Sequence, residues 1–114
     1  MTPDDMKTLK RINRVLGIMR TSISPTVPVQ VVQAFVAVAL NEGKSLTEIA
    51  QICGGNLSTT SRHLLDLGER NRKKEPGYGL VHRAEDAEQL RKNNYTLTPR
   101  GRLLAAQLAA VLED

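Results

Sequence analysis

Two short amphipathic segments joined by a pair of glycines constrain the fold of this chain more than any other feature. Ser45 and Glu48 stand at the spacing of a capping box, in which each side chain binds a free backbone N–H group at the start of a helix. Two short helices joined by a sharp turn form the minimal helix-turn-helix. The segments are the helix Ser45–Cys53, the turn Gly54-Gly55-Asn56 and a second helix from Asn56 or Ser58 to about Glu69.

The second helix separates apolar and polar residues onto opposite sides. At roughly 100° per residue, one side carries Leu57, Thr60, Leu64 and Leu67, and the other carries Ser58, Thr59 and Arg62. A DNA-recognition helix presents such hydroxyls and arginines to the major groove, where arginine pairs with guanine. A capped turn facing solvent has the same composition, so this face alone does not distinguish the two interpretations.

The flanking sequence predicts a mainly α-helical chain with a small β-hairpin. Apolar residues recur at three- and four-residue steps in Thr2–Arg20, which predicts a helix. Val29–Glu42 is apolar nearly all round; its length favours a buried helix, although its valines also permit a strand. Short strands are expected at Leu80–Arg83 and Asn94–Leu97, joined by a polar loop. The pair Thr98-Pro99 has the residue types that start a helix.

These elements predict a single winged helix-turn-helix domain of 114 residues. We expect N-terminal helices in residues 1–44, the helix-turn-helix and wing in 45–98, and a C-terminal helix in 99–114. The chain is long enough for one domain and too short for two.

The net charge of +4 is concentrated in one part of the chain. Between Leu57 and Arg102, ten Lys and Arg residues stand against six Asp and Glu residues, and in the remainder the two kinds balance at six each. A basic half suggests a polyanionic partner such as double-stranded DNA. The chain has only two Tyr and one Phe, which argues against a stacking platform for single-stranded nucleic acid.

Three stretches together resemble the winged helix-turn-helix of MarR-family regulators. Leu46–Leu67, LTEIAQICGGNLSTTSRHLLDL, resembles their helix-turn-helix. Gly79–Arg83, GLVHR, is similar to their first wing strand, and Tyr95–Gly101, YTLTPRG, to their second wing strand and the start of the last helix. The resemblance covers Ser45–Leu112, and the two N-terminal helices match the family only in kind.

The resemblance implies a dimeric transcriptional repressor or activator that binds double-stranded DNA. It implies that the first and last helices pack across a two-fold axis and that the wing reaches the minor groove, with Arg91 at the position of the family's wing arginine. Phosphate contacts are expected from Ser58, Ser61, Arg83 and Lys92, and base contacts from Thr59 and Arg62.

The chain departs from the family after the recognition helix. The stretch Leu67–Gly79 is longer than usual there and contains the basic residues Arg70, Arg72, Lys73 and Lys74. These residues are compatible with an added phosphate-contacting arm and equally with a solvated loop. The family's wing aspartate has no clear counterpart, because Asp86 and Glu88 are offset from its position.

No catalytic motif is present in the sequence, so we do not expect an enzyme. His63 and His82 have no cysteine or carboxylate at metal-ligand spacing, and no cofactor is expected. Cys53, the single cysteine, excludes an internal disulfide and lies on the apolar side of its helix, where a buried structural role is expected. The longest apolar stretch, Val27–Leu40, is shorter than the ~20 residues of a membrane span. The expected location is a reducing cytoplasm.

Two other functions remain compatible with these residues. The modest net charge and the acids Asp66 and Glu69 on the recognition helix are compatible with a winged-helix module that binds protein instead of DNA. A phage or plasmid replication or partition factor would use the same DNA-binding residues. The sequence indicates neither an operator, nor the sign of regulation, nor a small-molecule effector.

Overall fold

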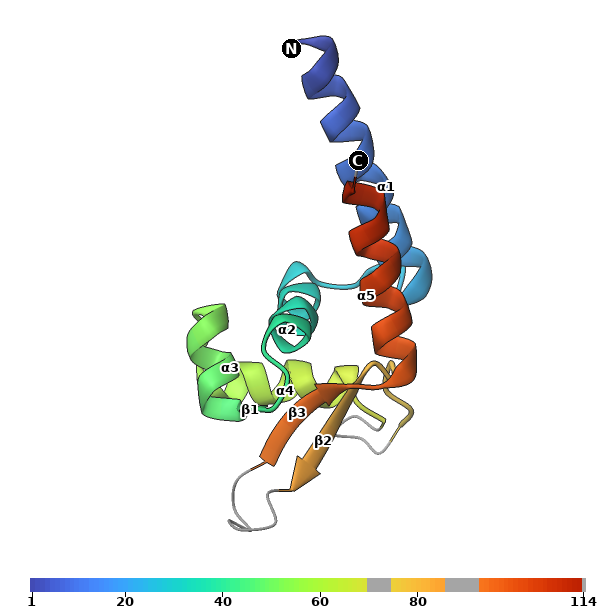
Figure 1. Ribbon diagram of the computed structural model, residues 1–114. Helices are drawn as coiled ribbons and strands as arrows, with labels where there is room; N and C mark the ends of the chain where they lie inside the picture. Colours follow the sequence, from blue (N-terminus) through green and yellow to red (C-terminus); the bar gives the residue numbers. More distant parts are fainter. Residues whose placement is uncertain (70–74, 86–92, 114) are drawn as a thin grey trace.

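The computed structural model describes residues 1–69, 75–85 and 93–113. Within them the chain forms α1 (Pro3–Ser22), α2 (Val29–Leu40), β1 (Lys44–Ser45), α3 (Leu46–Cys53), α4 (Leu57–Leu67), β2 (Val81–Glu85), β3 (Asn93–Leu97) and α5 (Pro99–Leu112) (Figure 1). The molecule is elongated, with principal extents of 53 × 26 × 26 Å. Helices α1 and α5 form one end, and the other helices and the sheet form the other end.

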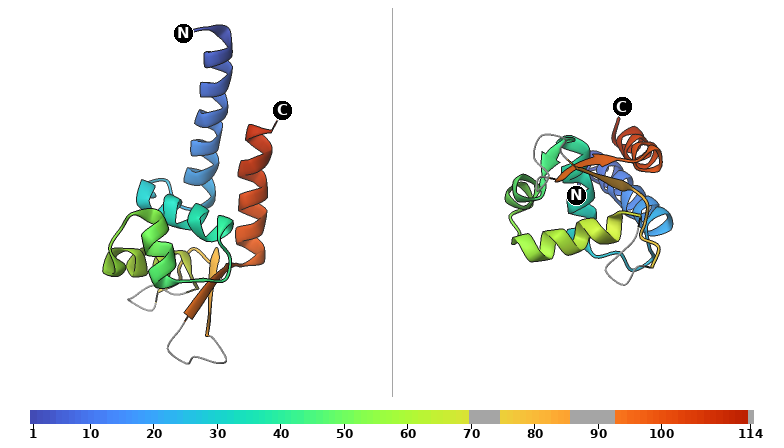
Figure 2. Two further views of the ribbon diagram at one scale, coloured as in Figure 1. Left: turned by 60° about the vertical axis from the view of Figure 1, so that its left-hand side comes forward. Right: turned by 90° about the horizontal axis from the view of Figure 1, so that it is seen from below.

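Helix α1 starts where its polar first turn predicts. Thr2 caps the helix: its Oγ1 accepts a hydrogen bond from Asp5 N at 3.1 Å, and Asp5 Oδ2 accepts one from Thr2 N at 2.9 Å. Only the C-terminal half of α1 lies beside α5, and its N-terminal half extends beyond the rest of the molecule (Figure 1, Figure 2). No described helix is both long and apolar enough to span a membrane.

The valine-rich segment is a helix, as its length predicts, and it ends two residues before the expected Glu42. At this end the Asn41 side chain turns back, and its Nδ2 donates to Ala37 O at 2.8 Å. Gly43 follows with a φ of 90°, a left-handed conformation that glycine adopts without strain. The Gly43 N–H then donates to Tyr95 O at 2.9 Å, so that the chain passes directly from α2 into the edge of the sheet.

The wing strands belong to a three-stranded antiparallel sheet in the order β1-β3-β2. Strands β2 and β3 pair from Val81↔Leu97 to Glu85↔Asn93, so that they extend beyond the predicted strands by two residues and one residue into the predicted hairpin loop. The two residues of β1, Lys44 and Ser45, pair with Tyr95 and Asn94. The sequence pattern does not predict β1, because two residues are too few to show an alternation.

The core lies between α2, α3, α4, the sheet and the first half of α5. Its largest fully buried side chains are Phe35, Val38, Ile49, Leu67, Leu80 and Val81. Leu104 joins them from α5 with 2% of its surface exposed. Helix α1 contributes no buried residue. Its apolar stripe, Met6, Leu9, Ile12 and Leu16, is 44–50% exposed.

The start of α5 is tied closely to the segment that precedes β2. Thr98 caps the helix, since its Oγ1 accepts from Gly101 N at 3.0 Å, and the same hydroxyl donates to Gly79 O at 2.7 Å. A Cβ atom on Gly101 would lie 2.1 Å from the carbonyl oxygen of Leu80. The predicted start of the last helix at Thr98-Pro99 is therefore confirmed, and Gly101 is needed because the two backbones touch.

Candidate nucleic-acid interface

Two helix caps and a glycine in the left-handed conformation define the helix-turn-helix. At the start of α3, Ser45 Oγ accepts from Glu48 N and Glu48 Oε1 accepts from Ser45 N, each at 3.3 Å, which confirms the capping box. Gly54 ends α3 in the left-handed conformation, with a φ of 69°. Asn56 then caps α4, because its Oδ1 accepts from Thr59 N at 2.8 Å. Of the two predicted starts for the second helix, Asn56 is the one found.

The inner side of α4 is mostly the predicted one. Thr60, Leu64 and Leu67 are buried, and Ala50 of α3 is buried as well. Leu57 is different: it is 50% exposed, so its assignment to the buried side was wrong. The reason is its position in the first turn. Leu57 is the first residue of α4, and Thr60, one turn further on, is the first residue of the helix that is buried.

The outer side of α4 brings the predicted recognition residues together. Ser58 and Arg62 are exposed one turn apart, while Thr59 and Ser61 are half-buried beside them. Among the described residues, no hydrogen bond or ion pair involves the Arg62 side chain. The four residues therefore form a polar surface at the N-terminal part of α4. The guanidinium of Arg62 on this surface has no hydrogen-bond or ion-pair partner among the described residues.

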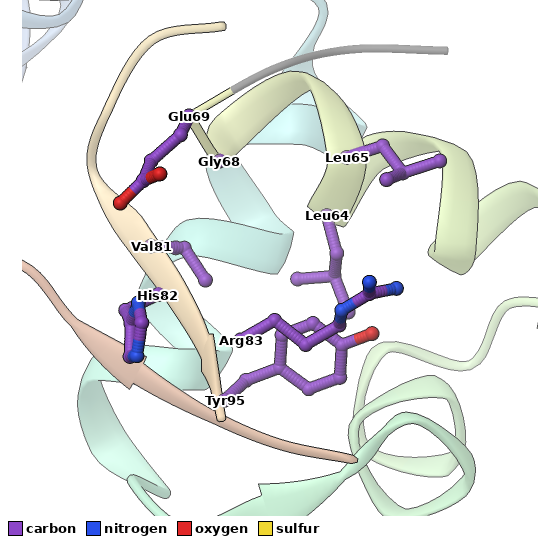
Figure 3. A pocket seen from close by; sticks show the side chains of 8 residues that line it. All are labelled: Leu64, Leu65, Gly68, Glu69, Val81, His82, Arg83 and Tyr95. Atoms are coloured by element: carbon purple, nitrogen blue, oxygen red, sulfur yellow. The ribbon is translucent and has the colours of Figure 1, made fainter. Parts of the chain in front are cut away.

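Arg83 lies between the recognition helix and the wing. It is exposed on β2, directly opposite Tyr95 of β3, on the sheet face that turns toward α4. Figure 3 shows its guanidinium above the hydroxyl of Tyr95, beside Leu64. These side chains line a cavity of about 280 Å³ between α4 and the sheet. Arg83, which the sequence predicts as a phosphate contact, thus lies where α4 and the wing strands meet.

Tyr95 is a site residue that the sequence analysis does not single out. Only 5% of it is exposed, and its ring belongs to the core. Burial raises the pKa of the phenol, and the positive charge of the nearby Arg83 acts in the opposite direction. Alternation along β3 marks Tyr95 as inward-facing, but an aromatic residue at a core position gives no signal that its hydroxyl contacts an arginine.

The two ends of the additional stretch after α4 are joined by backbone hydrogen bonds. The Glu69 carbonyl accepts from Gly77 N at 2.9 Å, and the Gly68 carbonyl accepts from Gly79 N at 2.9 Å. The Leu67 carbonyl accepts from Leu80 N at 2.8 Å. The predicted DNA contacts Lys73 and Lys74 between these ends, and Arg91 and Lys92 of the wing, lie outside the described residues.

Two further titratable side chains near the polar surface of α4 are those of Cys53 and His63. Cys53 is half-buried against the core, and burial raises the pKa of its thiol, which makes it less reactive. The Nε2 atom of His63, on α4, is buried without a hydrogen-bond partner among the described residues. Within the same residues, no cluster of three or more His, Cys, Asp or Glu could hold a metal ion.

Comparison with solved structures identifies the fold. No family profile matches the sequence, and no curated protein is significantly similar to it. A mutant of S. aureus MepR bound to an oligodeoxyribonucleotide superposes with a TM-score of 0.67 and 21% identity, over 94% of this chain and 71% of that one. A MarR family transcription regulator gives 0.64 and 21%, over 86% and 60%. Streptococcus pneumoniae FabT in complex with DNA gives 0.63 and 17%, over 94% and 66%.

These likenesses confirm the winged helix-turn-helix fold that the sequence predicts. The chain has the fold of MarR-family transcription regulators, and the elements that carry it are α3, α4 and the wing strands β2 and β3. It spans 60% of the length of the MarR family regulator and 66% of that of FabT.

Proposed function

We propose that this protein is a sequence-specific regulator of transcription that binds double-stranded DNA as a homodimer. The observation that supports it most is the polar surface of α4 formed by Ser58, Thr59, Ser61 and Arg62, with a free guanidinium on a helix whose opposite side is buried. Solved structures with this fold include a FabT complex with DNA and a MepR complex with an oligodeoxyribonucleotide. We expect the same use of the fold here.

In the proposed complex, α4 enters the major groove. Arg62 pairs with the O6 and N7 atoms of a guanine, and Thr59 contacts a neighbouring base edge. Ser58 and Ser61 donate to phosphate oxygens at the rim of the groove. Phosphate contacts set the register of the protein on the duplex, and the base contacts select the sequence.

The wing and the basic stretch complete the proposed contact surface. Arg83 contacts phosphate between α4 and the wing, Lys92 contacts phosphate from the wing, and Arg91 enters the minor groove, whose negative potential attracts arginine. Lys73 and Lys74 add phosphate contacts from the stretch after α4. Each such cation releases condensed counterions from the DNA, so that binding weakens as the salt concentration rises.

The homodimer is proposed because α1 and α5 leave apolar surface uncovered. In addition to the half-exposed stripe of α1, Leu103 and Leu112 on α5 are 61% and 54% exposed. A second copy of the chain that paired with these helices would remove this surface from water. It would also place two recognition helices on one side of the dimer.

The sharpest test of the recognition surface is the substitution Arg62→Ala. We expect it to weaken binding to the preferred site by about 1–3 kcal/mol and to relax the preference for one base pair, because the bidentate contact to guanine is lost. The preferred site is first obtained by selection from a random duplex pool. Affinities for this site and for each of its single-base variants are then measured by fluorescence anisotropy at one fixed salt concentration.

The matched control is Lys10→Ala, which removes one positive charge from the N-terminal half of α1, at the opposite end of the molecule from the wing. Because Lys10 is far from the proposed interface, we expect its affinity and base preference to equal those of the wild type. Equal affinity of the Arg62→Ala variant and the wild type would contradict the proposed role of α4. If the wild type itself bound no duplex at micromolar concentration and low salt, a winged-helix module for protein partners would be the better interpretation.

A further inference from the structure

The backbone of Tyr95 is held from both sides. β3 is the central strand of the sheet, and Tyr95 pairs with Lys44 of β1 on one side and with Arg83 of β2 on the other. Its carbonyl accepts a hydrogen bond from Gly43 N at 2.9 Å. Hydrogen-bonded neighbours on both sides therefore fix the position of the Tyr95 backbone.

The ring of Tyr95 is buried, and its hydroxyl reaches the surface at Arg83. The ring packs in the core with Leu64 and Val81 among its neighbours, whereas Arg83 is exposed. Directly opposed residues on an antiparallel pair lie close enough for their side chains to touch. Figure 3 shows the outcome, with the guanidinium of Arg83 folded over the phenol hydroxyl. The hydroxyl of Tyr95, whose ring is fixed in the core, thus lies beside Arg83, a long side chain with many rotamers.

A tyrosine hydroxyl is a suitable partner for an arginine whose positive charge binds an anion. Arginine has five N–H donors, and a phenol oxygen can accept from only some of them. The phenol also carries no charge at neutral pH. A carboxylate partner would neutralise the guanidinium, but among the described residues no ion pair joins Arg83 to an Asp or Glu. The hydroxyl can therefore orient Arg83 and leave its charge free for an anion.

Packing alone does not hold Arg83 in this orientation. The cavity of about 280 Å³ beside it leaves room for other rotamers of a long side chain, which loses conformational entropy when it is fixed. The hydroxyl of Tyr95 is the polar contact that selects one of these orientations.

We propose that Tyr95 is a positioning residue for Arg83 and holds its guanidinium toward a DNA phosphate at the junction of α4 and the wing. This inference rests on the proposed function, because it assigns a role within the same DNA interface. It predicts that the hydroxyl contributes to DNA affinity only through Arg83.

The test is a double-mutant cycle with Tyr95→Phe and Arg83→Met, measured as affinity for the selected duplex over a range of salt concentrations. Arg83→Met keeps an apolar stem of similar length and should weaken binding about tenfold and reduce the salt dependence by about one ion. Tyr95→Phe keeps the buried ring and should weaken binding about fivefold, the scale of one hydrogen bond. In the Arg83→Met background, Tyr95→Phe should have no effect.

Tyr78→Phe is the matched control, since it removes the hydroxyl of the other tyrosine, which is outside the cavity that Arg83 lines. Equal affinity of Tyr95→Phe and wild type, or an equal loss from Tyr95→Phe in both backgrounds, would overturn the inference and leave the proposed function intact. Absence of duplex binding by the wild type would overturn both.

A second measurement keeps the inference testable even if Tyr95→Phe does not fold. The ¹³Cζ resonance of a tyrosine reports on hydrogen bonds to its hydroxyl. We expect Arg83→Met to shift the Tyr95 resonance of the free protein and to leave that of Tyr78 in place. Addition of the selected duplex should shift the Tyr95 resonance in the wild type but not in Arg83→Met. An unchanged Tyr95 resonance in Arg83→Met would show that the contact is absent in solution.

Discussion

At the scale of single residues, Gly101 lies where the first turn of α5 passes close to the backbone of Leu80. Its hydrogen-bonded neighbour Thr98 brings the first turn of α5 against the carbonyl of Leu80, as the hydroxyl bridge to Gly79 shows. A backbone carbonyl in a hydrogen-bonded segment cannot move aside as a side chain can, and Leu80 O itself accepts from Thr98 N at 3.1 Å. Any side chain at residue 101 must therefore displace the helix.

We predict that Gly101→Ala destabilises the protein by about 1–3 kcal/mol, the usual cost of forcing extra atoms into a packed site. The new Cβ would lie 2.1 Å from Leu80 O, which is far inside van der Waals contact. The free energy of unfolding is measured by urea denaturation with circular dichroism. Arg100→Ala, at an exposed residue in the same turn of α5, is the control.

The Arg100 side chain is exposed, so its truncation to alanine should change the free energy of unfolding by no more than about 0.5 kcal/mol. If both variants unfolded at the wild-type urea concentration, the close approach of α5 to Leu80 would be refuted.

Sequence patterns predict the residues whose roles are local. Ser45, Glu48 and Thr98 form helix caps with residues three positions away, and each is found in its predicted role as a cap. The second hydrogen bond of the Thr98 hydroxyl, to Gly79 O, joins distant parts of the chain, and no local pattern predicts it. The burial of Leu57 and the contact between Arg83 and Tyr95 depend on what packs nearby in space. Periodicity places Leu57 on the inner side of α4 but cannot show that the core ends at Thr60.

At the scale of elements, α3 depends on the ionised form of Glu48. Hydrogen bonds from the backbone and side chain of Ser45 hold the pKa of this carboxyl below its ordinary value of 4.5, and Lys44 adds a favourable charge at 3.5 Å. A carboxyl whose pKa is lower in the folded state stabilises the fold above its unfolded pKa. This contribution is lost as the pH falls through the folded pKa.

We predict that Glu48→Gln abolishes this part of the pH dependence of stability. Glutamine also forms a capping box, so α3 keeps its start, but its amide does not titrate. The variant should be less stable than the wild type at pH 7, and the difference should shrink as the pH falls through and below 4.5. Urea unfolding at several pH values measures this difference.

Asp5→Asn at the matching position of α1 is the comparison, because hydrogen bonds from Thr2 likewise lower the pKa of Asp5. A stability difference between Glu48→Gln and wild type that stayed constant from pH 7 to pH 3 would contradict the role of the ionised Glu48.

The helices are predictable from their own sequence, whereas the short strand β1 is not. Helices α1, α2, α4 and α5 have enough turns for an apolar period to appear, and they are predicted within about two residues at their starts. β1 has only two residues, and it exists because the Gly43 N–H meets β3, roughly fifty residues further along the chain. Such a strand is defined by its partner and not by its own composition.

At the scale of the whole molecule, the packing of the single chain does not explain what stabilises α1. A helix of 20 residues with a well-formed cap has no buried residue, and its first half extends beyond α5 (Figure 2). Packing of an apolar face normally stabilises such a helix more than its intrinsic propensity does. A groove between α1 and α5, lined by Asn13, Gly17, Ile18 and Gln107 among others, is open as well. Both features follow if a second copy covers this end.

We predict that Leu16→Asp converts the protein from a dimer to a monomer. The side chain is 50% exposed in the middle of the stripe, and a carboxylate there would be buried without a partner in the dimer. Light scattering after size-exclusion chromatography measures the mass against that of one chain, 12.6 kDa. Lys10→Gln changes the charge of α1 by the same amount on its polar side, and it should remain dimeric.

The proposed dimer also makes a prediction about the form of the DNA site. Two recognition helices related by a two-fold axis select a palindrome whose half-sites lie roughly one helical turn apart, about 34–36 Å. Leu16→Asp should bind such a palindrome no more tightly than a single half-site, because the two half-sites are no longer bound by one particle. α4 and the wing are untouched by this substitution, so affinity for an isolated half-site should not change. A wild-type protein that is monomeric at micromolar concentration, or that selects a site without two-fold symmetry, would contradict pairing through α1 and α5.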